Sequence, residues 1–224
     1  KQSDFKSIAP STMSNQATIP KAVLSDQIHQ ALAGRPVKAA IFLTFQFDPG
    51  FFGEEILPGP VDQSFSHVPK IRLVQLEEVM RSLNLAVYYD RSGLVAEAKP
   101  ARLDYQRIGF RRSTGFFHPK NILLLVQNAK DEEYWDSLLF VTLSANLTRA
   151  GWWENVEVTH LEEIKWGQDS SLRQDVRDLL ASLEEFDRTG REHRALNALR
   201  SFLANDVSDA KHKRQEGRWL PRLY

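Results

Sequence analysis

Three short runs of the sequence are almost entirely apolar and rich in residues that favour β-strands. They are residues 37–47 (VKAAIFLTFQF), 121–126 (NILLLV) and 138–143 (LLFVTL). A strand with one solvated face alternates apolar and polar residues, whereas a strand covered on both faces is apolar throughout. The first run is the clearest case, and it predicts a sheet with other layers packed on both sides.

Helical spacing of apolar residues surrounds these runs. We predict helices over residues 21–33, 74–83, 172–186 and 196–203, and a short helix over 50–57 capped by Asp48-Pro49. Further strands are predicted over 85–89, 101–110 and 155–161, and a loop over 58–67. Strands alternate with helices in the first two thirds and two helices follow. This order predicts an α/β fold, a mixed β-sheet flanked by helices, with C-terminal helices.

The length of 224 residues allows one well-buried core with a small appendage. We predict a flexible arm or linker over residues 1–19 and a main domain over 20–166. A helical extension packed on that domain is expected over 167–204, followed by a basic tail over 205–224.

Composition excludes several classes of site and of protein. The chain has no cysteine, which excludes disulfides, thiolate zinc sites and cysteine nucleophiles, and fits a reducing, cytoplasmic setting. No apolar run approaches the roughly 20 residues that span a bilayer, so we expect no membrane association. The formal net charge is zero, yet residues 105–120 carry four cations and no carboxylate. Such a local basic stretch favours phosphate binding.

Five side chains form a candidate phosphodiesterase site: His118, Lys120, Ser144, Asn146 and Glu157. They lie at or near the ends of neighbouring predicted strands. A neutral imidazole can attack phosphorus near pH 7, while an ammonium, an amide and a hydroxyl can contact the phosphate oxygens. Glu157 would accept a hydrogen bond from the second ring nitrogen of His118 and fix its tautomer. This chemistry requires neither a metal ion nor another cofactor.

Residues 115–160 resemble the phospholipase D superfamily, and within it the tyrosyl-DNA phosphodiesterases and related nuclease-like domains. The stretches are FHPKNILLL (117–125) and VTLSANLTRAGWWENVEV (141–158), with IFLTFQFDPGFF (41–52) as a similar opening strand and helix. The resemblance implies a phospholipase D-like mixed sheet flanked by helices. It implies His118 as nucleophile or its acid–base counterpart, Lys120 and Asn146 as phosphate ligands, and Glu157 as the orienting carboxylate.

Two departures from the superfamily pattern matter. Leu125 stands where the wider family has an aspartate, which indicates the tyrosyl-DNA phosphodiesterase branch. His118 is also the only histidine followed two residues later by lysine, whereas the family builds one site from two such motifs. The resemblance therefore implies half a site, completed by a second copy in a homodimer or by a second phospholipase D-like half. It favours DNA over RNA as substrate.

Other residues have both a functional and a structural interpretation. Arg111, Arg112 and Arg149 would line a nucleic-acid groove or simply form a solvated surface. Trp152 and Trp153 would stack on a base or fill the core, and we expect the core for at least one. His160 lies near glutamates but lacks partners at ligand spacing, so we predict no metal there.

Three functions fit the sequence. The leading hypothesis is a metal-independent phosphodiesterase, nuclease-like, that cleaves nucleic acid through a phosphohistidine. The second is hydrolysis of a lipid or another small phosphodiester, which would favour an apolar surface near the site. The third is a catalytically incomplete nucleic-acid-binding or assembly module of a larger bacterial defence or repair protein.

Overall fold

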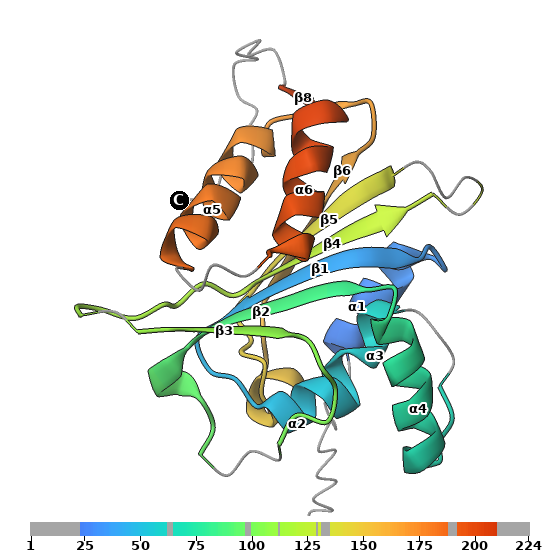
Figure 1. Cartoon of the computed structure of the whole chain (residues 1–224), viewed down its shortest axis with the longest axis vertical. Helices are drawn as coiled ribbons and strands as arrows, with labels where there is room; N and C mark the ends of the chain where they lie inside the picture. The colour runs from blue at the N-terminus through green and yellow to red at the C-terminus, as the bar shows by residue number, and fades with distance from the viewer. Residues whose placement is uncertain are drawn as a thin grey trace, which may run out of the picture.

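The computed structural model of the protein describes residues 23–61, 65–96, 100–111, 113–128, 130, 135–187 and 192–209. Its centre is a six-stranded mixed sheet of order β3-β2-β1-β4-β5-β6 (Figure 1). The strands are β1 (Val37–Thr44), β2 (Asn84–Asp90), β3 (Gln106–Phe110), β4 (Asn121–Gln127), β5 (Trp135–Leu143) and β6 (Thr159–Lys165). β1, β2 and β3 are parallel, whereas β4, β5 and β6 pair in antiparallel fashion. The predicted α/β fold is confirmed.

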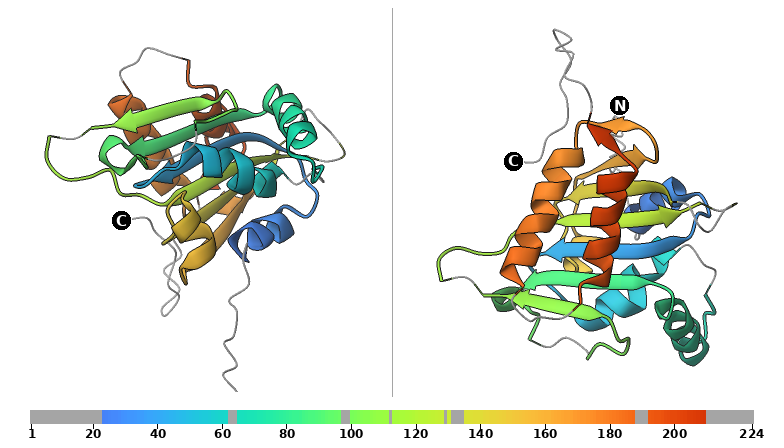
Figure 2. Two further views of the ribbon diagram at one scale, coloured as in Figure 1. Left: turned by 90° about the horizontal axis from the view of Figure 1, so that it is seen from below. Right: turned by 45° about the horizontal axis from the view of Figure 1, so that its top comes forward.

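Helices cover both faces of this sheet (Figures 1 and 2). One face carries α1 (Val23–Leu32), α2 (Pro49–Phe51), the π-helix η1 (Phe52–Ile56), α3 (Pro58–Val61), α4 (Pro69–Met80) and the π-helix η3 (Ala150–Glu154). The other face carries α5 (Arg173–Phe186) and α6 (Arg194–Asn205), flanked by the short pair β7 (Asp169–Ser170) and β8 (Ser208–Asp209). Within the described residues, no helix has the length and apolar content needed to cross a membrane.

The central strands are apolar throughout because successive side chains enter two different cores. In β1, Ala40 and Phe42 pack in the core under α1–α4, whereas Ile41 and Leu43 pack against α5 and α6. β4 alternates in the same way. Its Leu125 is fully buried among the apolar side chains of the second core. An aspartate there would bury a carboxylate in apolar surroundings at a high cost in free energy.

Several element boundaries differ from the predictions. α4 begins at Pro69, five residues before the predicted start, because proline suits the first helical turn. The predicted loop over 58–67 contains the short helix α3. The predicted strand over 155–161 begins only at Thr159, since Asn155 still caps the π-helix η3. Phe186 shares the apolar helical spacing of the predicted helix over 172–186, but its side chain is 46% exposed at the end of α5.

Some predictions concern residues outside the described part of the chain. The predicted arm over 1–19 lies wholly outside it, and so does most of the predicted basic tail, from residue 210 onward. The first residues of that tail stretch complete α6 and form β8.

Candidate active site

The candidate residues gather at one edge of the sheet. β1 and β5 end at this edge, at Thr44 and Leu143, and β4 begins there at Asn121. The chain runs outward from β1 through β2 to β3 and then returns to the other side of β1 as β4. In open α/β sheets, ligands bind beyond the carboxyl ends of strands where the strand order reverses. This edge is therefore the place where a ligand site is expected.

His118 and Lys120 lie side by side in the segment that leads into β4. The Lys120 Nζ atom is 3.1 Å from Nδ1 and 3.2 Å from Nε2 of His118. The lone-pair and N–H directions of the two ring nitrogens diverge, so one ammonium cannot bond well to both. At least one nitrogen stays available to a substrate. Burial lowers the pKa of the Lys120 ammonium, while the Glu157 carboxylate acts in the opposite direction.

Aromatic rings support the exposed His118 side chain. Its imidazole packs on the Phe45 ring, with centroids 5.0 Å apart, just beyond the end of β1. The ring of Phe116 contacts the same Phe45 edge-on at 5.6 Å. Phe117 points the other way into the core and packs on Phe110, with ring centroids 4.5 Å apart. Successive side chains of this segment point in opposite directions, so Phe117 anchors the segment in the core while His118 remains exposed.

A buried carboxylate, Asp90 at the end of β2, holds the same segment. Its Oδ2 accepts a hydrogen bond of 2.7 Å from the backbone N–H of Phe117, and its Oδ1 accepts bonds from the N–H and hydroxyl of Ser92. Sequence reasoning missed this residue. The available signal was an acidic residue ending an otherwise apolar strand, which indicates a side chain with a specific partner.

Two glycines allow close backbone approaches at the site. A Cβ on Gly93 would lie 2.2 Å from the carbonyl oxygen of Phe45, the residue that supports His118. A Cβ on Gly151 would lie 2.6 Å from the carbonyl oxygen of Asn146 and 2.7 Å from its nitrogen. Both positions therefore exclude any larger residue without a backbone shift, and sequence reasoning singled out neither of them.

Ser144 and Glu157 form a hydrogen-bonded pair beside Lys120. The Ser144 hydroxyl donates to Glu157 Oε2 and accepts a bond of 2.8 Å from the N–H of Val158. The other oxygen of Glu157 accepts from the Asn155 amide at 3.3 Å. Among the described residues the Glu157 carboxylate makes no hydrogen bond to His118. Its predicted role as the orienting carboxylate therefore remains a prediction.

Asn146 bridges the ends of β5 and β1. Its Oδ1 accepts a hydrogen bond of 3.1 Å from the N–H of Gln46, and its Nδ2 donates to Gln46 Oε1 across 3.4 Å. The buried Thr44 hydroxyl accepts from the N–H of Leu147 at 3.2 Å and completes this junction. The side-chain amide therefore has a fixed position, with its Nδ2 donors only weakly occupied.

The three predicted nucleic-acid contacts lie in different settings. Arg111 lines a cavity of about 380 Å³ beside the His118 segment, together with Arg91 and the exposed Phe116. Arg112 lies outside the described residues. Arg149 lies over the rings of Phe51 and Trp153, at 5.4 and 4.8 Å from their centroids, so aromatic contacts engage its guanidinium.

Other predictions concern the aromatic and histidine residues nearby. Trp152 is buried, and its Nε1 donates to Ser25 Oγ at 2.8 Å, so the expectation that at least one tryptophan fills the core is confirmed. The Nε2 of the exposed His160 lies 2.9 Å from a carboxylate oxygen of Glu162. Among the described residues there is no group of three side chains suited to hold a metal ion.

The fold is similar to solved structures of low sequence identity. No protein-family model and no curated protein matches the sequence. Yeast tyrosyl-DNA phosphodiesterase aligns with a TM-score of 0.44 and 12% identity, over 83% of this chain and 40% of that enzyme. NucT from Helicobacter pylori aligns with a TM-score of 0.35 and 9% identity, over 72% of this chain and 83% of that protein. The chain thus spans less than half of the length of the yeast enzyme.

Proposed function

We propose that the chain is one half of a metal-independent phosphodiesterase that cleaves nucleic acid, DNA in preference to RNA, through a phosphohistidine. The observation that carries the proposal is the pairing of His118 and Lys120, with Nζ 3.1 Å from Nδ1, at the switch-point edge of the sheet. An imidazole and an ammonium at this separation can contact the phosphorus and a non-bridging oxygen of one phosphate group.

The proposed reaction has two steps. A ring nitrogen of His118 attacks phosphorus, a P–N bond forms, and the P–O bond to the leaving alkoxide breaks. A histidine of the second half donates a proton to that oxygen. In the second step this histidine takes a proton from water, the water oxygen attacks phosphorus, and the P–N bond breaks. Lys120 and the Nδ2 donors of Asn146 would stabilise the charge on the non-bridging oxygens in both steps.

The open surroundings of His118 support the need for a second half. Apolar side chains beside the site are strongly exposed: Phe116 by 62%, Val156 by 81% and Val158 by 75%. Val158 is adjacent because its backbone pairs with Ser144, and Phe116 precedes His118 by two residues. Exposed apolar groups around a polar centre are typical of a surface that another protein surface covers. A symmetry-related copy or a second phospholipase D-like half would cover them here.

A polyanionic substrate is favoured by the cavity next to His118. Arg91 and Arg111 line it, and the Arg91 guanidinium is held by a bond of 2.8 Å from Nε to the carbonyl oxygen of Gly109. Phe116 adds an exposed ring on which a base can stack. A strand whose scissile phosphate lies at His118 would place a neighbouring nucleotide here.

Cleavage of single- and double-stranded DNA and RNA in the presence of EDTA tests the proposal. We expect His118→Ala to reduce the rate by at least about 10³-fold, since the nucleophile is lost. His29→Ala is the matched control, because His29 is exposed on α1, and it should retain full activity. Full activity of the His118→Ala variant would exclude the phosphohistidine route. Cleavage of phospholipid vesicles in place of nucleic acid would indicate hydrolysis of a lipid. The exposed side chains of Phe116, Val156 and Val158 also favour that alternative.

The second candidate is a catalytically incomplete nucleic-acid-binding or assembly module. The open half-site with a single His-x-Lys motif favours it. Measuring the mass in solution, with and without DNA, separates the two candidates. A dimer with EDTA-resistant activity supports the enzyme, whereas a monomer that binds DNA without cleaving it supports the module.

A further inference from the structure

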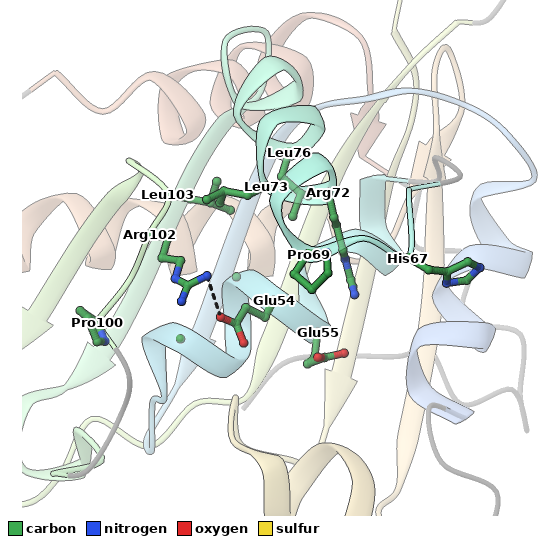
Figure 3. Close-up of a pocket in the computed structure, with 12 residues that line it drawn as sticks. Glu54, Glu55, His67, Pro69, Arg72, Leu73, Leu76, Pro100, Arg102 and Leu103 are labelled. Atoms are coloured by element: carbon green, nitrogen blue, oxygen red, sulfur yellow. Dashed lines mark ion pairs between the residues drawn. The ribbon is translucent and has the colours of Figure 1, made fainter.

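A separate cavity of about 310 Å³ lies between η1, α4 and the segment that leads into β3 (Figure 3). None of the phosphodiesterase candidates lines it. Its apolar wall is formed by Leu73, Leu76 and Leu103, and two of these leucines are almost fully buried. The volume falls at the lower end of the range of about 300–1,000 Å³ for small-molecule pockets.

Arg72 of α4 brings an unsatisfied donor to this cavity. Its Nε atom is shielded from solvent and has no hydrogen-bond partner among the described residues. Arg72 also forms no ion pair within this part of the chain. Figure 3 shows the side chain descending from α4 toward the helix η1. Buried polar groups normally have partners, and a guanidinium forms its strongest bonds to a planar pair of acceptors. A ligand with two adjacent acceptors would satisfy this group.

The facing helix brings two carboxylates. Glu55 lines the cavity, and its side chain forms no ion pair or hydrogen bond within the described part of the chain. Glu54 lies 3.9 Å from Arg102, a loose contact between side chains that are 37% and 58% exposed. Arg102 is therefore available to an anionic group at the mouth of the cavity. The ligand should thus present donors to Glu55, acceptors to Arg72 and an anion to Arg102.

We propose that this cavity binds the guanine base of a nucleotide. Guanine carries the acceptors O6 and N7 on one edge, the pattern that arginine recognises, and N–H donors at N1 and N2 that suit a carboxylate. The base would rest against the leucines, and its phosphate would meet Arg102. Adenine reverses the pattern, because it presents an amino group where guanine presents O6. A zwitterionic amino acid with a neutral side chain satisfies Arg72 and Glu55 but adds no anion at Arg102, whose described ion pair is the loose contact with Glu54.

The proposal goes beyond the phosphodiesterase function and does not depend on it, because the two sites share no residue. Calorimetric titration of the full chain with GMP, and with AMP as the matched ligand, tests it. We expect AMP to bind at least about tenfold more weakly than GMP. A single-stranded oligonucleotide with one guanine, compared with its adenine counterpart, distinguishes a free nucleotide from a base within a strand.

Two variants assign the binding to this cavity. Arg72→Met and Glu55→Gln should each weaken GMP binding by about 10-fold or more, since each removes one bidentate contact. Arg81→Met, an exposed change at the end of the same helix, should leave it unchanged, and so should His118→Ala. Urea unfolding of each variant checks that the fold is intact. Equal affinity for GMP and AMP, no binding of either, or unchanged GMP binding by a folded Arg72→Met variant would overturn the proposal.

Discussion

Replacing Gly93 with alanine tests whether the close contact between Gly93 and the Phe45 backbone fixes the position of His118, which packs on the Phe45 ring. Gly93 ends the short 3-10 helix η2 (Arg91–Gly93) that follows β2. A Cβ at this position would lie 2.2 Å from the Phe45 carbonyl oxygen and 2.9 Å from the carbonyl carbon. The obstacle is backbone on both sides, so no side-chain rotation can relieve it. The φ angle of Gly93 is not in the left-handed region, and the clash alone therefore determines the outcome.

The size of the effect follows from the contact distance. Real Cβ atoms essentially never approach a heavy atom closer than 3.0 Å, so the two backbones must separate by about 0.8 Å, the difference from 2.2 Å. Overpacking of this kind costs about 1–3 kcal/mol of stability, or a decrease in Tm of about 2–12 °C for a chain of this length. The shift moves the ring on which His118 rests. Because a misplacement of about 1 Å can cost about 10²-fold in rate, we expect a 10- to 100-fold loss of cleavage activity.

Gly53→Ala is the matched control for this change. A Cβ there would meet its nearest heavy atom, Leu103 Cδ1, at 3.6 Å, which is ordinary contact. Its position in the helix η1 favours alanine by about 0.5–1 kcal/mol. Thermal unfolding and EDTA-resistant cleavage should be measured for both variants. If Gly93→Ala matches the wild type in Tm and in cleavage rate, the close approach of Gly93 to Phe45 does not position His118, and the reasoning fails.

Two further outcomes are expected. Asp90→Ala leaves the buried N–H of Phe117 without an acceptor, at a cost of about 1–3 kcal/mol of stability. It should therefore reduce cleavage more than the control Asp104→Asn, which changes an exposed residue. Equal urea midpoints for the two variants would contradict this. Burial opposes ionisation of Glu163, but hydrogen bonds from Arg35 and Ser137 lower its pKa below the ordinary 4.5. The ionised Glu163 therefore stabilises the fold above about pH 4.5, and this contribution is lost as the pH falls further. Glu163→Gln should be less stable than the wild type at pH 7 and nearly equal to it in acid, and a stability difference independent of pH would refute this.

Local sequence was enough to predict most of the fold. The apolar runs over 37–47, 121–126 and 138–143 correspond to β1, β4 and β5. They could be recognised because a strand that is buried on both faces is apolar at nearly every residue. The boundaries of α4 and β6 were wrong. In the second case a π-helix occupies residues 150–154 and delays the strand, and the sequence does not signal that irregular turn.

The sequence by itself identified the candidate site residues and the strands beside which they stand. Five candidate side chains stand near the ends of predicted strands, so the sequence alone places them near strand ends in a sheet. They are His118, Lys120, Ser144, Asn146 and Glu157. Only the tertiary structure decided how they are held. Asp90 lies 27 residues from Phe117 in sequence, and Gly93 meets Phe45 across the sheet edge. It also decided that Glu157 bonds to Ser144 rather than to His118, and that Arg72 and Glu55 line the same cavity. Such contacts join segments that are far apart in the sequence, and local residue patterns do not specify which of these segments meet in space.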